Sequence, residues 1–243
     1  TTSTLQQEAN SKLGMGSRAT MASAQKLYQE GRITYMRTDS VNLSSQAIAA
    51  SADYIKRLYG IEYSHVRKFK TKSAGAQEAH EAIRPTDITR ESVSGSDYDQ
   101  RLYDLIRRRT LASQMAPAKL ENTTITIGIN DGEKQNNSSK TNDKLVFEAK
   151  GQVVLFDGFL RVYGGGKDDT ILPTVKSGAQ LQRHSVEARQ VFARPPARYT
   201  EGTLVKKLEE LGIGRPSTYA TIMNTIQTRG YAEKGDSEGV PRD

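Results

Sequence analysis

Apolar residues recur at intervals of three and four along much of the chain, the spacing that places them on one face of a helix. The pattern predicts helices over residues 3–13, 17–30, 44–60 and 98–113, and two further helices around 204–211 and 219–226. In the first helix, Thr4 and Gln7 have the spacing of a capping box. In the second helix, the side chains expected to face inward are Met21, Ala24, Leu27 and Tyr28.

Other signals predict the connections between these helices. Residues 65–77 are polar and basic and predict a loop, and residues 77–84 predict a short helix that Pro85 ends. Gly212–Arg215 predicts a turn between the last two helices. Pro216 is expected in the first turn of the final helix, where its missing amide is tolerated.

A different pattern occupies residues 120–190, where apolar and polar residues alternate and Gly, Asn and Asp fill the gaps. It predicts antiparallel strands over Thr123–Ile129, Leu145–Ala149 and Gln152–Phe156, with Asp131–Asn142 as a polar hairpin loop. Pro195 and Pro196 mark a boundary after this region. We therefore expect an α+β multidomain chain, mainly helical on both sides of a β-rich segment.

A short alternation, Ile33–Met36, follows the second helix and predicts a strand on which Ile33 and Tyr35 share one side. This stretch and the residues after it combine a phenol, a guanidinium, hydroxyls and a carboxylate. Tyr35 can attack a phosphodiester, and Arg37 can hold the phosphate oxygens with its planar fork of donors. A core tyrosine beside a surface arginine fits the same spacing, so the residues alone leave both interpretations open.

The amino-acid composition restricts the kinds of partner that the chain can bind, but it says little about the reaction. The 243 residues include 35 Lys and Arg against 28 Asp and Glu, a net charge of +7 that suits a polyanion such as nucleic acid. The absence of cysteine excludes disulfides and thiolate zinc sites. No apolar run approaches the ~18 residues of a membrane span, so no membrane partner is expected.

Four stretches together resemble one family. Ile33–Ser40, with the sequence ITYMRTDS, resembles the active-site segment of the type IA family of bacterial DNA topoisomerases. Thr1–Gln7, Glu78–Pro85 and Gly212–Tyr219 resemble the same family in the same order, and the resemblance covers about residues 1 to 234. Met36 favours the topoisomerase I branch, because the topoisomerase III branch usually has Pro after the tyrosine.

The resemblance implies an activity and a set of site residues. Tyr35 would cleave one DNA strand, giving a 5′-phosphotyrosine and a free 3′-hydroxyl, and resealing without ATP would relax negatively supercoiled DNA. Arg37 would be the second catalytic residue, stabilising charge on the phosphate. The DNA-binding positions that the resemblance implies are Thr34, Thr38, Asp39, Gln25, His80, Arg84, Arg215, Thr218 and Arg229.

Several of these positions keep a second interpretation. Arg84 fits a phosphate contact and equally an ion pair with a local carboxylate. Ser217 and Thr218 open a helix whose amide groups favour anions, but they also fit simple helix caps. Gln25 fits solvated surface, and the family often has Glu where this chain has Gln29.

The resemblance also implies a domain organisation. Residues 1–118 would be the helical domain that carries the tyrosine, residues 119–197 a β-rich segment of the arch around the DNA, and residues 198–243 a helical DNA-binding segment. Magnesium would be bound by the acidic cluster of a separate Toprim domain before Thr1, so the chain looks like a piece of a longer protein. Gly235–Asp243 matches no family pattern.

No metal site is expected within the chain itself. His80-Glu81 begins like a zincin motif, but position 84 is Arg where the second histidine would be. Asp97 and Asp99 precede a helix, so capping and compensation of the helix dipole account for them.

The expected partners are single-stranded or underwound DNA and the Toprim domain of the parent chain, in a monomer of the bacterial cytoplasm associated with the nucleoid. On its own the chain is expected only to bind single-stranded DNA. The alternative function is a non-catalytic single-strand-binding module. A tyrosine recombinase fits less well, because its tyrosine follows the His-x-x-Arg element, whereas Tyr35 precedes His80 and Arg84.

Overall fold

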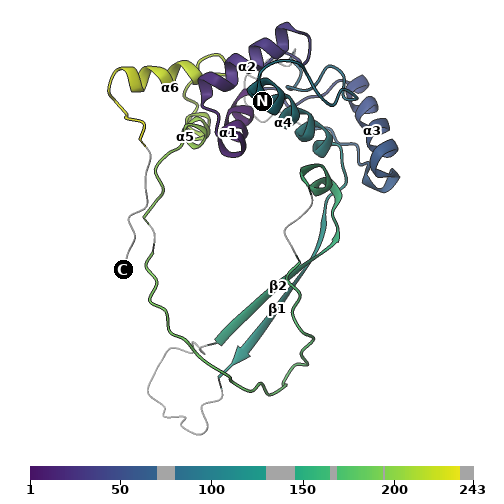
Figure 1. Ribbon diagram of the computed structural model, residues 1–243, viewed down its shortest axis with the longest axis vertical. Coiled ribbons are helices and arrows are strands. Elements are labelled where there is room, and N and C mark those ends of the chain that lie inside the picture. The colour runs from purple at the N-terminus through teal and green to yellow at the C-terminus, as the bar shows by residue number, and fades with distance from the viewer. Residues whose placement is uncertain (70–79, 130–145, 165–168, 194, 236–243) are drawn as a thin grey trace. The chain divides into compact units, whose positions relative to one another are not determined.

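The computed structural model describes residues 1–69, 80–129, 146–164, 169–193 and 195–235. The chain divides into two compact units, one of Thr1–Met115 with Pro195–Asp243 and one of Ala116–Arg194. The long helices lie in the first unit and the paired strands in the second (Figure 1), in agreement with the expected α+β class. No helix among the described residues has the length and apolar character needed to cross a membrane.

The first unit begins with four helices at the predicted positions. They are α1 (Thr2–Leu13), α2 (Ser17–Gln29), α3 (Ser45–Tyr59) and α4 (Asp97–Ser113), with a short 3-10 helix, η1 (Ile61–Tyr63), after α3. The predicted capping box of α1 is wrong. Thr1 and Thr4 form it, because the helix begins at Thr2 and Thr4 is therefore already its third residue. Gln7 instead donates to the Ser3 hydroxyl at 2.8 Å.

The main apolar core of this unit includes side chains from α1, α2 and α4 and from the segment that follows α2. Leu27, Ile33, Met36, Leu102 and Tyr103 belong to it, and each is at most 1% exposed. Burying a side chain of this size stabilises a fold by about 1.5–3 kcal/mol. Because Ile33 and Met36 are both in the core, the backbone is anchored on each side of Tyr35.

A buried carboxylate ties α2 to the start of α4. Asp99 is 4% exposed and closes a capping box with Ser96 at the start of α4. A capping role for Asp99 was predicted, but Ser96 was not predicted as its partner. It also accepts a short hydrogen bond from the Ser23 hydroxyl and an ion-paired bond from Lys26 Nζ at 2.7 Å. Burial opposes ionisation of Asp99, but these donors outweigh it and hold the pKa of the carboxyl well below its usual 3.8.

We expect Asp99→Asn to lower the free energy of unfolding at pH 7 by about 1–3 kcal/mol, since it weakens charge-assisted hydrogen bonds to a buried carboxylate. Lys26 is half exposed, so its share is small. Because the native pKa of Asp99 is depressed, its stabilisation is present above about pH 4 and is lost as the pH falls below that. Urea unfolding at pH 7 and pH 3 measures this.

The matched control is Asp97→Asn, because Asp97 lies in the same first turn but its side chain is 79% exposed. It should change stability by less than about 0.5 kcal/mol. An Asp99→Asn protein as stable as the control at pH 7 would show that this carboxylate does not hold α2 and α4 together.

The segment carrying Tyr35 is not the predicted strand. Ile33 forms an isolated antiparallel bridge with Pro85, and the Thr34 amide donates to the Arg84 carbonyl at 2.9 Å. Local alternation cannot reveal a partner so distant in sequence, so the pairing that defines this segment was missed. The predicted helix over 77–84 is also wrong where it is described, because residues 80–84 are not helical.

Some predictions fall partly or wholly outside the described residues. Residues 65–69 have no regular secondary structure, as the predicted loop requires, and the rest of that loop is not described. The predicted hairpin loop Asp131–Asn142 and nearly all of Gly235–Asp243 also lie outside.

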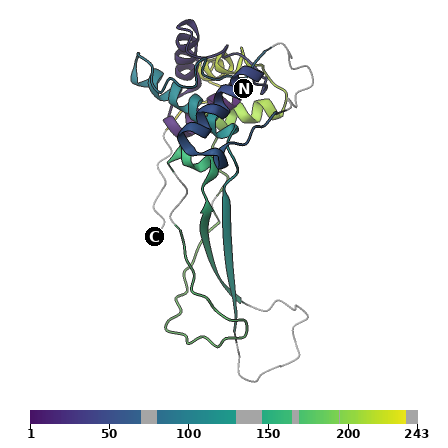
Figure 2. The ribbon, with the colours of Figure 1, turned by 90° about the vertical axis from the view of Figure 1, so that its right-hand side faces the viewer.

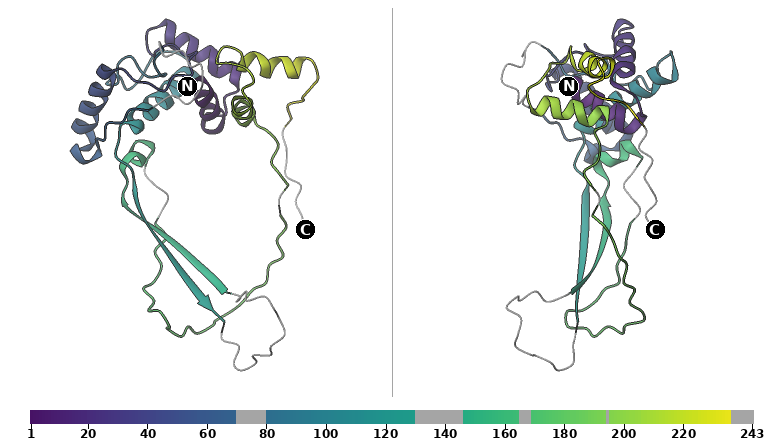
Figure 3. Two further views of the ribbon diagram at one scale, coloured as in Figure 1. Left: turned by 180° about the vertical axis from the view of Figure 1, so that it is seen from behind. Right: turned by 90° about the vertical axis from the view of Figure 1, so that its left-hand side faces the viewer.

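The helices α5 (Glu201–Glu210) and α6 (Tyr219–Thr228) complete the first unit, with α5 packed on α1 and α6 in contact with α2 (Figures 1 and 3). Val205, Tyr219 and Met223 form a small apolar cluster there. Pro216 does not lie in the first turn of α6, contrary to prediction, because the helix begins three residues later at Tyr219.

The second unit contains β1 (Lys119–Gly128) and β2 (Val146–Phe156), an antiparallel pair that Figure 2 shows side by side, and a short 3-10 helix, η2 (Gly158–Tyr163). The predicted interruption between residues 149 and 152 is wrong, since Gly151 pairs with Thr123 within one continuous strand. A Cβ at Gly151 would lie 2.5 Å from the Thr170 carbonyl oxygen. Glycine therefore lets Thr170 pair with Gln152 beside it.

Candidate active site around Tyr35

Tyr35 lies between two buried anchors. Ile33 and Met36 are each 1% exposed, whereas the Tyr35 side chain is 39% exposed. The predicted alternation is therefore wrong, because Ile33 shares the core with Met36 and not with Tyr35. The anchors fix the backbone while the phenol remains accessible, which is the arrangement a nucleophile requires.

Two aromatic rings flank the phenol ring of Tyr35. The Tyr28 ring centroid lies 5.3 Å from that of Tyr35 with the planes at 68°, and the His80 centroid lies 5.8 Å away with the planes at 79°. Both are edge-to-face contacts of the kind that stabilise aromatic pairs. Tyr28 was predicted to face inward but is 40% exposed, so that prediction is wrong.

Thr34 holds the segment after His80 against the tyrosine. Its hydroxyl donates to the Ala82 carbonyl at 2.7 Å and accepts from the Arg84 amide at 2.9 Å. Together with the backbone bond from Thr34 to Arg84, these contacts bring the second family-like stretch beside the first. The Thr34 hydroxyl is thus occupied by the protein backbone, and its contribution to the site is positioning.

Arg84 takes the second of its two predicted interpretations in this structure. Its Nε and Nη2 atoms donate to the two carboxylate oxygens of Glu81 at 2.8 and 2.9 Å. Glu81 also accepts from the Ser44 amide at 2.7 Å, at the start of α3. Burial opposes ionisation of Glu81, but the bonds from Arg84 and Ser44 outweigh it and lower the pKa of the carboxyl.

Thr38 is also committed to the backbone. It is 2% exposed, its hydroxyl accepts from the Ser40 amide at 3.0 Å, and its own amide donates to the Thr2 hydroxyl at 2.9 Å. The Thr2 hydroxyl in turn lies 2.7 Å from the Met36 carbonyl oxygen, to which it donates. The start of α1 therefore fixes the backbone on both sides of Arg37.

Arg37 is exposed, and within the part of the chain that the structure describes no carboxylate pairs with it. Its anchored neighbours Met36 and Thr38 hold the backbone, so the guanidinium is directed away from the core. A cation held on a fixed backbone and still free to bind is suited to a phosphate.

Charges from the turn before α6 and from the segment after Tyr35 both influence Tyr219, the first residue of α6. Burial raises the pKa of the Tyr219 phenol, the charges of Glu209 and Asp39 raise it further, and Arg215 opposes them. Asp39 and Arg215 therefore both act on Tyr219. The Arg215 side chain is exposed and donates to the Gly214 carbonyl at 2.7 Å, while the Thr218 hydroxyl accepts from the Arg215 amide at 2.8 Å.

The remaining predicted positions are more scattered. Arg229 is exposed at the C-terminal end of α6, about 16 Å along the helix from Thr218 at its start, so it is not brought together with Arg215. Gln25 is half-buried on α2, one turn before Tyr28. The predicted capping role of Ser217 is not seen, because the N-cap of α6 is Thr218 and it makes no side-chain capping hydrogen bond.

A family model described as DNA topoisomerase matches residues 1–243. The chain belongs to this DNA topoisomerase family. It is 46% identical to DNA topoisomerase 1 of Zymomonas mobilis, covering 99% of this chain and 20% of that protein. The corresponding protein of Mycolicibacterium smegmatis is also 46% identical, with 99% and 27% covered. The chain thus spans about a quarter of the length of these relatives.

A solved structure agrees with the sequence relatives. Full-length topoisomerase I of Thermotoga maritima superposes with a TM-score of 0.73 at 35% identity, covering 96% of this chain and 38% of that one. The relationship to bacterial DNA topoisomerase I expected from Ile33–Ser40 and its companion stretches is therefore confirmed.

Sequence reasoning missed three residues of this candidate site. Tyr28 was assigned to the core because it follows Ala24 and Leu27 at helical spacing. Thr2 gave no signal that its hydroxyl would bind carbonyls more than thirty residues away. An ion pair of Arg84 with a local carboxylate was one predicted interpretation, but Glu81 was not named as the partner, although a carboxylate three residues earlier is a signal for such a pair.

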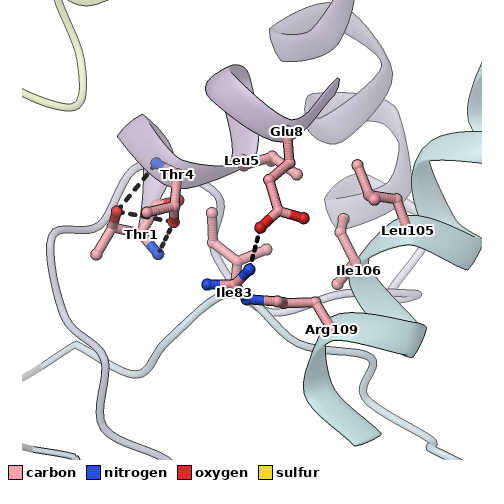
Figure 4. Close-up of a pocket in the computed structure, with 8 residues that line it drawn as sticks. All are labelled: Thr1, Thr4, Leu5, Glu8, Ile83, Leu105, Ile106 and Arg109. Atoms are coloured by element: carbon pink, nitrogen blue, oxygen red, sulfur yellow. Dashed lines mark hydrogen bonds and ion pairs between the residues drawn. The ribbon is translucent and has the colours of Figure 1, made fainter. Parts of the chain in front are cut away.

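The described residues of this topoisomerase chain contain no group of three or more His, Asp or Glu side chains arranged to hold a metal ion. The magnesium that the family resemblance implies, which it places in a separate domain, is therefore not assigned to any of these residues. A hollow lies between α1 and α4, and its lining does not include Tyr35. Figure 4 shows the residues that line it: Thr1, Thr4, Leu5, Glu8, Ile83, Leu105, Ile106 and Arg109. Glu8 and Arg109 form an ion pair there.

Proposed function

We propose that this chain carries the nucleophile and part of the strand-binding surface of a type IA DNA topoisomerase. The observation that supports this most directly is the exposed phenol of Tyr35, held between two buried anchors beside His80. Two residues later, Arg37 is exposed and pairs with no carboxylate among the described residues. A core tyrosine, the competing interpretation, does not account for an exposed ring on a backbone fixed this firmly.

In the proposed reaction the Tyr35 oxygen bonds to phosphorus while the bond from phosphorus to the 3′-oxygen breaks. The phenol loses its proton and the departing 3′-oxygen gains one. The covalent intermediate retains the phosphodiester energy, so attack by the 3′-hydroxyl reverses the step without ATP. Arg37 binds the phosphate as charge develops on it, and the exposed Arg215 contributes a further cation to the strand.

The same proposal assigns roles to the residues around Tyr35 and to the rest of the chain. Thr34 and Thr38 position the segments on either side of Tyr35, while Asp39, Gln25 and His80 contact or orient the strand. Ala116–Arg194 contributes to the arch around the DNA, and magnesium is bound by a Toprim domain outside these residues. The protein works as a monomer. It acts in the cytoplasm, because the nucleoid DNA that is its substrate lies there.

This function predicts that the chain binds single-stranded DNA in preference to duplex, with an affinity that falls as salt increases. Each phosphate neutralised should contribute about −0.7 to the slope of log affinity against log salt. Arg215→Ala should reduce the slope by about that amount and weaken binding to all sequences. Fluorescence anisotropy with labelled oligonucleotides over a range of salt concentrations measures both.

Arg189→Ala is the matched control, since it removes the same charge from an exposed arginine that is paired with Glu187 in the second unit. It should leave affinity and slope nearly unchanged. Affinity that does not depend on salt, or a clear preference for duplex, would contradict the proposed function. A non-catalytic binding module, the second candidate, predicts the same binding but no covalent adduct in a full-length enzyme.

A further inference from the structure

Tyr28 places a second exposed phenol beside the nucleophile. It extends from the last turn of α2, and its ring is 40% exposed although it lies on a helix whose neighbouring residues Ala24 and Leu27 are completely buried. Water therefore reaches a large apolar ring at the centre of the candidate site. What sets this exposed tyrosine apart is its place, because its ring lies against that of the candidate nucleophile.

The rings of Tyr28 and His80 meet that of Tyr35 edge to face and are not stacked on it. The planes of Tyr28 and Tyr35 meet at 68°, so the contact is edge-to-face and cannot cover both faces of both rings. His80 contacts Tyr35 in the same manner at 79°. Gln25 precedes Tyr28 by three residues on α2, a spacing that brings its amide to the same face of the helix. An exposed aromatic face is the kind of surface on which proteins stack an unpaired base, and a neighbouring amide can hydrogen-bond to the same nucleotide.

We propose that Tyr28 stacks an unpaired nucleobase of the bound strand next to the phosphate that Tyr35 attacks. This inference rests on the proposed function, because it places the base on the strand that the site would cleave. The π-face of a base is common to all four nucleotides, so the stacking site tolerates any sequence. The cations of Arg37 and Arg215 bind the backbone of the same strand, and Tyr28 fixes the register of the base.

The test uses the chain itself and a set of single-stranded oligonucleotides, each with one abasic position. Tyr28→Ala should weaken binding to the intact oligonucleotide by about 5- to 150-fold, the range for losing one stacked base. Tyr28→Phe should bind within about twofold of the wild type, because the phenyl ring still stacks. The salt slope should not change in either variant, because stacking neutralises no phosphate.

The abasic series separates stacking from a loss of structure. In the wild type, one abasic position should cost about as much affinity as Tyr28→Ala, and in Tyr28→Ala the same position should cost nothing further. A general loosening of the site would instead leave the variant as sensitive to that position as the wild type. The control is Tyr98→Ala, which removes a 53% exposed tyrosine from the first turn of α4. This variant should bind the oligonucleotides as the wild type does.

The outcomes distinguish this inference from the function on which it rests. If wild-type binding depends on salt but Tyr28→Ala binds equally well, or stays sensitive to every abasic position, the stacking site is refuted and the proposed function stands. If the wild type fails to bind single strands at all, both are refuted. Matching unfolding midpoints of the variants confirm that they fold.

Discussion

Tyr35→Phe is expected to eliminate the covalent protein–DNA adduct while changing single-strand affinity by less than about twofold. The substitution keeps the ring contacts with Tyr28 and His80 but removes the oxygen that would attack phosphorus. The adduct is measured in a full-length topoisomerase that carries this segment, after denaturant is added to trap the cleaved state. Affinity is measured on the chain itself.

Tyr98→Phe is the matched control for this experiment, because it removes a phenol oxygen from another exposed tyrosine. It should form the adduct as the wild type does. An adduct that persists in Tyr35→Phe would mean that a different residue is the nucleophile. A large loss of affinity in that variant would mean that the phenol oxygen binds the strand rather than attacking it.

The second large effect is an absence of activity: the chain alone should leave negatively supercoiled plasmid unrelaxed in the presence of magnesium. A phenol attacks only when its proton is removed, and the described residues contain no cluster that could hold the metal ion. Donors such as Arg37 contribute about 3–4 kcal/mol each to lowering a barrier, whereas enzymes lower barriers by about 8 kcal/mol or more. Agarose gel electrophoresis of the plasmid measures the outcome.

Addition of a separately expressed Toprim domain from a relative tests where the missing chemistry resides. Relaxation that appears only in the mixture agrees with the division of labour proposed above. Relaxation by the chain alone would contradict it, since these residues would then suffice for cleavage and strand passage. The Tyr35→Phe chain is the control for contamination by a host topoisomerase, because it should be inactive in both conditions.

The helices could be predicted because the information that sets them is local. The apolar stripe of α4 and the capping role of Asp99 at its start both depend on residues close in sequence, and the structure confirms both. The segment around Tyr35 could not be predicted in the same way. Its conformation depends on the bridge from Ile33 to Pro85 and on Thr2, and neither partner is near in sequence.

The sequence predicted which residues make up the candidate site better than it predicted what each side chain does there. The four family-like stretches identified Tyr35, Arg37, His80 and Arg215, but a motif does not say whether a side chain contacts a ligand or holds the backbone. Thr34 and Arg84 proved to be occupied by other parts of the protein. Tyr28 was missed because helical spacing reports which side chains can face inward, not which are covered.

The central claim is that Tyr35 forms the bond to DNA, and one measurement tests it directly. The adduct formed by a full-length topoisomerase carrying this segment is digested with nuclease and protease, and the modified peptide is sequenced by mass spectrometry. We expect a nucleotide joined through its 5′-phosphate to Tyr35. A nucleotide on any other residue, or one joined through its 3′-phosphate, would contradict the account.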